Sequence, residues 1–134
     1  MGSKRIVLAV LAGGVAFFVT GFLLYGLLLR EVMVANTAAG TMKEIPDFPP
    51  LILSNLVLAA FLTLILSKWD GARNLIGGVK AGVPIGLLWA LGVGLALYAA
   101  TNMMTGVGVL VDTAATVVRF AVAGGAIGAI SGRR

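Results

Sequence analysis

Few residues of this chain could do chemistry, and three of them lie close together near its C-terminus. Arg119 lies inside an apolar run, Asp112 lies seven residues before it, and Thr116 lies between them. Seven residues make about two turns of an α-helix, so the three side chains share one face, with Arg119 and Asp112 about 10 Å apart along the axis. That spacing is too long for an ideal pair on successive turns. Arg119 could still reach toward Asp112, or share with it a water held by Thr116.

Two interpretations of Arg119 stay open. If its apolar run crosses a membrane, the charge costs roughly 2.5–3.5 kcal/mol, and the side chain must face the protein interior, a partner or a watery cavity. It could hold helices in register by bonding to carbonyls and hydroxyls. It could instead offer a cation to an anionic or strongly polar solute. An arginine stays protonated, so any proton coupling would have to run through Asp112.

A second group of polar side chains ends the preceding apolar run. Tyr98 and Asn102 are four residues apart and share a helical face. We expect them at the same level of the membrane as Asp112, together with Tyr25 and with Asn55, which would bond across helices. Such convergence predicts a polar pocket that opens toward one side of the membrane. The alternative is an aromatic belt with helix caps, which Tyr and Asn commonly supply.

The missing residue types exclude several classes of site. The chain has no His and no Cys, which removes disulfides, thiol chemistry, histidine bases and most transition-metal sites. It has no phosphate-binding loop and no closely spaced carboxylate pair in a helix. The net charge of +5 is scattered along the chain, unlike the basic stripe of a nucleic-acid-binding protein. We therefore expect no enzyme, no metal, no cofactor and no nucleic acid.

Composition indicates a membrane protein. Of the 134 residues, 60% are hydrophobic and 11% charged, and the mean hydropathy is +1.07. Soluble domains carry about 25% charge, and disordered chains are polar, so both classes are excluded. The length allows one compact unit, which we place over residues 1–134.

Four apolar windows are long enough to cross a bilayer, which needs roughly 20 residues. They run from about 6–29, 51–66, 75–100 and 109–130. Long continuous runs favour helices over the alternating strands of a barrel, and the first run exceeds the core of a signal peptide. We predict an all-α bundle of four transmembrane helices. The connection over 31–50 is either a lid or an extension of the first helix beyond the bilayer.

The Lys and Arg residues predict the orientation. Seven lie on or near the side of the two termini, namely Lys4, Arg5, Lys68, Arg73, Lys80, Arg133 and Arg134, and only Arg30 and Lys43 lie on the other. Because cytoplasmic loops are rich in Lys and Arg, we expect both termini in the cytoplasm. Membrane lipid is then the main partner.

Small residues recur at four-residue steps and predict close helix crossings. The third span carries a ladder of Gly78, Gly82, Gly86, Ala90 and Gly94, and the fourth carries Gly124 and Gly128. A thinner stripe in the first span comprises Ala9, Gly13, Phe17, Gly21 and Tyr25. These crossings could form within one chain or between copies, and we expect a homo-oligomer.

Several segments resemble a group of small bacterial inner-membrane proteins. They are Tyr-Ala-Ala-Thr-Asn at 98–102, Leu-Val-Asp at 110–112, the Gly-rich last span, and the opening motifs at 4–6, 12–15 and 21–26. The group has four predicted helices and is classed as a domain of unknown function. The resemblance implies the architecture and a multi-pass location in the bacterial inner membrane, and it implies no mechanism.

These patterns leave two functions to compare. The first is binding or transport of a small polar or anionic solute in an intrabundle pocket, at the substrate-binding candidates Arg119, Asp112, Thr116, Tyr98, Asn102 and Tyr25. The second is a structural or accessory membrane protein that assembles through its Gly-lined faces and has no substrate.

Overall fold

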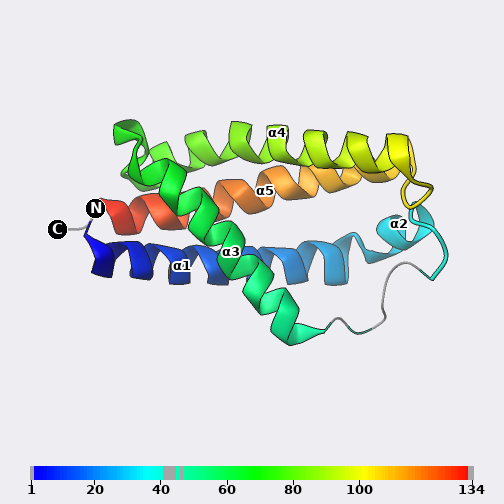
Figure 1. The fold of residues 1–134 in the computed structure, drawn as a ribbon, viewed down its shortest axis with the longest axis horizontal. Coiled ribbons are helices and arrows are strands. Elements are labelled where there is room, and N and C mark those ends of the chain that lie inside the picture. Colours follow the sequence, from blue (N-terminus) through cyan, green and yellow to red (C-terminus); the bar gives the residue numbers. More distant parts are fainter. Residues whose placement is uncertain (1, 41–44, 46, 133–134) are drawn as a thin grey trace.

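The computed structural model describes residues 2–40, 45 and 47–132 (Figure 1). Its elements are α1 (Ser3–Gly21), the π-helix η1 (Phe22–Leu28), α2 (Arg30–Ala35), α3 (Phe48–Ser67), the 3₁₀-helix η2 (Asp70–Ala72), α4 (Leu75–Ala100) and α5 (Gly106–Ser131). Four helical stretches are long and apolar enough to cross a membrane. The predicted all-helical architecture with four possible spans is confirmed.

The helix bounds agree with the apolar windows at α4 and differ elsewhere for local reasons. α3 begins at Phe48, earlier than predicted, because Pro49 and Pro50 occupy its first turn, where proline is tolerated. α5 begins at Gly106 because the hydroxyl of Thr105 caps it, accepting a hydrogen bond from the Gly108 N–H at 3.1 Å. The first span is not one α-helix, since it continues beyond Gly21 as the π-helix η1.

Both ends of the described chain lie at the same end of the bundle, here called the near end (Figure 1). The Arg5 guanidinium lies 3.5 Å from the Ser131 carbonyl, and a Cβ on Gly132 would meet the carbonyl of Arg73, beside η2. The opposite end, the far end, holds α2 and the α4–α5 connection. There Thr37 and Met104 form an isolated antiparallel bridge. Lys43, Arg133 and Arg134, used above for the orientation, lie outside the described residues.

The closest helix contact is between α4 and α5. All five residues of the α4 ladder are buried, and both Gly124 and Gly128 of α5 are buried as well. A Cβ on Gly78 would meet the backbone carbonyl of Gly124, and one on Gly82 would meet that of Phe120. The ladder therefore lets the two backbones touch within one chain.

The other two long helices close the bundle around α5. α1 lies along α5, with Ala9, Gly13 and Phe17 buried, and α3 crosses α1 diagonally (Figure 1). The rings of Phe61 and Trp89 are 5.6 Å apart and join α3 to α4. Large apolar side chains cover much of the outer surface, which suits contact with lipid.

The α4 ladder predicts that added volume is tolerated only outside the helix contact. Gly82→Ala would push a methyl group against the Phe120 carbonyl, whereas Gly92, on the same helix, has nothing within 4 Å of an added Cβ. We expect Gly82→Ala to lower the free energy of unfolding by about 1–3 kcal/mol, despite the higher helix propensity of alanine. Gly92→Ala should keep or raise it. Denaturant titration in detergent, followed by circular dichroism, compares the two; equal stability would contradict the predicted contact.

Candidate functional site

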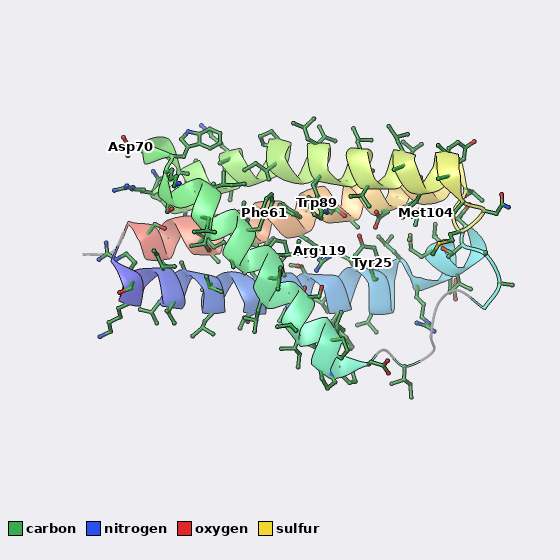
Figure 2. All side chains as sticks on the ribbon, in the orientation of Figure 1. Tyr25, Phe61, Asp70, Trp89, Met104 and Arg119 are labelled. Atoms are coloured by element: carbon green, nitrogen blue, oxygen red, sulfur yellow. The ribbon has the colours of Figure 1, made fainter. Side chains whose placement is uncertain are left out.

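Arg119 lies near the middle of α5 and binds two other helices. Its Nη2 donates to the Asn55 side-chain oxygen of α3 at 2.8 Å and to the Phe17 carbonyl of α1 at 3.2 Å. Asn55 is buried and is itself oriented by a hydrogen bond from its amide nitrogen to the Leu51 carbonyl at 2.8 Å. One guanidinium thus ties α1, α3 and α5 together at the centre of the bundle (Figure 2).

Aromatic rings and a glycine shape the space around the guanidinium. Its central carbon lies 5.5 Å from the centre of the Phe17 ring and 5.6 Å from that of Tyr25, distances at which a cation is attracted to an aromatic face. A Cβ on Gly21 would lie 3.2 Å from Nε and Nη2. Glycine at position 21 therefore gives the guanidinium room to lie flat against α1.

The two hydrogen bonds leave part of the guanidinium without a partner. An arginine has five N–H donors, and those on Nη2 account for both bonds. Nε is buried and has no hydrogen-bond partner within the described part of the chain. No carboxylate there forms an ion pair with Arg119, although α5 carries one on the same face, at Asp112. The site therefore holds a partly buried cation whose buried Nε has no hydrogen-bond partner in the described part of the chain.

Asp112 is bound by Tyr25 instead. The Tyr25 hydroxyl donates to Oδ1 of Asp112 at 2.6 Å and lies 3.2 Å from the Thr116 hydroxyl. Three predicted site residues, Tyr25, Asp112 and Thr116, therefore meet at the Tyr25 hydroxyl. Because the Tyr25 ring faces Arg119 while its hydroxyl binds Asp112, Tyr25 links the two charges of α5. Figure 2 shows Tyr25 on the far-end side of Arg119.

The π-helix carries Tyr25 to this position. Within η1 the hydrogen bonds span five residues, as in the bond from the Leu29 N–H to the Leu24 carbonyl at 2.7 Å. Wider turns of this kind are rare and occur frequently at functional sites. The four-residue stripe of the first span, which ends in Gly21 and Tyr25, predicts the face toward α5, but no sequence signal we used predicts the π geometry.

Tyr98 and Asn102 lie elsewhere. Both line an open hollow of about 580 Å³ at the far end, between the segment after α2 and the α4–α5 connection. Its walls are held by hydrogen bonds from the Ala38 N–H to the Met103 carbonyl at 2.8 Å and from the Thr105 hydroxyl to the Asn36 side-chain oxygen at 2.7 Å. The lining includes none of Arg119, Asp112 or Tyr25, so the expected single pocket is two separate sites.

Two expectations about individual contacts also change. The spacing left open a partial approach of Arg119 to Asp112; in the structure each binds a residue of another helix, and Tyr25 occupies the place beside Asp112. Asn55 was expected at the same level of the membrane as Tyr98 and Asp112. In the structure its side chain binds Arg119. The sequence did not predict that the Phe17 carbonyl accepts a hydrogen bond from Arg119, since every residue type has a backbone carbonyl. The described residues contain no group of three or more His, Cys, Asp or Glu that could hold a metal.

Comparison of the chain with family models, with curated proteins and with solved structures returned no match.

The Arg119–Asn55 bond predicts a specific cost on its removal. Asn55→Leu keeps the side chain's size but removes the acceptor from Nη2. Hydrogen bonds to charged groups contribute about 1.5–3 kcal/mol, and we expect the free energy of unfolding to fall by that amount. Ser54→Leu changes the exposed neighbouring position and should have little effect. Denaturant titration in detergent measures both; a stable Asn55→Leu protein would show that this bond contributes little.

Proposed function

We propose that this chain is a small multi-pass membrane protein that binds, and passes across the membrane, a small anionic solute at Arg119. The observation that carries the proposal is a partly buried guanidinium whose Nε has no hydrogen-bond partner, and which has no carboxylate in direct contact, among the described residues. A charge inside a membrane protein is costly and commonly marks an ion or substrate pathway. An anion would accept a hydrogen bond from the guanidinium N–H that has no partner.

The geometry supports a route toward the far end. From the centre of the bundle outward, Arg119 is followed by the Tyr25–Asp112–Thr116 group, and the hollow lined by Tyr98 and Asn102 lies beyond it. We propose that this hollow is the outer entrance. Its lining carries no charged side chain among the described residues, so this part of the hollow would admit polar solutes without trapping an ion before Arg119.

A structural role is the second candidate, favoured by the bonds from Arg119 to both α1 and α3. In that case the guanidinium is a cross-link and no solute exists. The Gly-lined faces proposed for assembly are already occupied, because the α4 ladder is buried against α5. The homo-oligomer that we continue to propose would have to use other positions, such as the open Gly92.

The proposed location is the bacterial inner membrane with the near end in the cytoplasm. In the described part of the chain, Lys4, Arg5, Lys68 and Arg73 lie at or beside the near end, whereas Arg30 begins α2 at the far end. This asymmetry follows the positive-inside rule. Membrane lipid would surround the exposed apolar side chains.

Replacing Arg119 separates the two candidate functions. In proteoliposomes we expect the wild-type protein to take up chloride, nitrate or formate, and Arg119→Gln to reduce uptake by about tenfold to a hundredfold, the equivalent of a charged hydrogen bond. Arg73→Gln, which removes an exposed arginine at the near end, should retain uptake. If Arg119→Gln does not fold, Arg119→Lys takes its place in the test, and we expect it to fold because it keeps the cation. A wild-type protein that takes up none of these anions would favour the structural role.

The absence of native cysteine allows a direct test of orientation. Single cysteines at Asp70, in η2, and at Ala39, in the far-end connection, both lie at exposed positions. In intact bacterial cells we expect a membrane-impermeant maleimide to label Ala39→Cys only, and to label Asp70→Cys only after the membrane is disrupted. The reverse pattern would contradict cytoplasmic termini, and labelling of both in intact cells would indicate insertion in two orientations.

A further inference from the structure

The polar centre of the bundle contains one positive and one negative charge. Arg119 is the cation, and Asp112 is the carboxylate that lies within the same membrane-spanning helix. Tyr25 contacts both, with its ring 5.6 Å from the guanidinium carbon and its hydroxyl 2.6 Å from Oδ1 of Asp112. With both groups ionised the cluster is electrically neutral.

Few titratable or charged groups face Asp112. From η1 the group is Tyr25, and from α5 itself it is Arg119, while Thr116 is neutral. α3 contributes the neutral Asn55 to the cluster. No contact with Asp112 is found for Lys80, the charged residue of α4, or for Arg30 and Glu31 of α2, in the part of the chain that the structure describes. Asp112 is thus the one carboxyl of this group.

An anion bound at Arg119 would change the charge of the cluster. It would add a negative charge to a neutral pair and leave one charge uncompensated in a membrane interior, where such a charge is expensive. The Tyr25 hydroxyl keeps its proton and donates a hydrogen bond to Asp112. Arg119 is already protonated and cannot take up another proton. Asp112 is the group that can restore neutrality, by becoming a carboxylic acid.

We propose that binding of an anion at Arg119 is coupled to uptake of one proton by Asp112, so that anion and proton enter the site together. This inference rests on the proposed anion site at Arg119. The proton comes from a hydronium ion of the solvent: one O–H bond of hydronium breaks and releases water, and one O–H bond forms at Oδ2, for which no hydrogen-bond partner is found within the described residues. Oδ1 continues to accept from Tyr25.

Linkage gives this coupling a measurable size. If one proton binds with each anion, the anion binds more tightly as pH falls, by up to about tenfold per pH unit. By reciprocity, anion binding strengthens proton binding by the same factor. A cross-link without a solute site shows neither effect.

Calorimetric titration of the purified full chain in detergent tests the coupling. The probes are chloride and nitrate, whose own charge does not change between about pH 5 and 8, since they are anions of strong acids. Measurement in two buffers of different ionisation enthalpy counts the protons taken up. We expect about one proton per anion in the wild-type protein, with the affinity falling toward high pH.

Two variants assign the proton. Asp112→Asn keeps an oxygen that can accept from Tyr25, and we expect it to bind the anion with no proton uptake and no pH dependence. Glu31→Gln removes an exposed carboxylate of α2 and should behave as wild type. If Asp112→Asn does not fold, the two-buffer measurement on the wild-type protein still decides whether a proton is taken up.

The outcomes distinguish this inference from the proposed function. Wild-type protein that binds the anion through Arg119 without taking up a proton would overturn the coupling and leave the anion site standing. Proton uptake that persists in Asp112→Asn would assign it to another group and also overturn the inference. Absence of anion binding at every pH, or binding unchanged in Arg119→Gln, would overturn the proposed function itself.

Discussion

The cost of holding a guanidinium inside an apolar bundle constrains the arrangement of the helices. Arg119 lies inside the bundle, so its hydrogen bonds must come from protein. They come from a carbonyl of α1 and an amide of α3. This requirement is consistent with Asn55 being buried in α3, and with the absence of a side chain at Gly21. Two rings beside the cation complete its surroundings.

The α4–α5 contact is organised by a different force. For helices that lie in a bilayer, the hydrophobic effect does not drive association, and close packing of the backbones takes its place. Gly78 and Gly82 of α4 place their α-carbons directly against carbonyls of α5. The resulting pair forms one wall of the bundle, and α1 packs on α5 beside it. Packing thus gives α5 a defined position, from which Asp112 faces η1 and Arg119 faces α1 and α3.

The two charges of α5 are kept apart by Tyr25. A direct ion pair between Arg119 and Asp112 would satisfy both groups and leave little reason for a ligand. With Asp112 bound to the Tyr25 hydroxyl, the guanidinium keeps a donor unpaired. A neutral aromatic side chain separates the cation from the carboxylate. This separation permits the proposed coupled binding, in which an anion binds at Arg119 and a proton binds at Asp112.

The sequence by itself determined the four spans and the face of each main helix contact. Long continuous apolar runs are stable in a bilayer as helices of that length. The four-residue glycine steps of α4 define one side of its helix. The shared face of Asp112, Thr116 and Arg119 follows from helical geometry in the same way.

Only the tertiary structure decided which residues these faces meet. The partners of Arg119 are the Asn55 amide, 64 positions away, and the Phe17 carbonyl, 102 positions away, and spacing along the chain carries no information about either. The placement of Tyr25 depends on a π-helix, which the spacing of apolar and small residues in the sequence does not predict. Tyr98 and Asn102 reach a separate hollow because the far-end connections pair with each other. Helical periodicity is local and can be read from residue types, whereas the crossing and register of helices depend on contacts between distant parts of the chain.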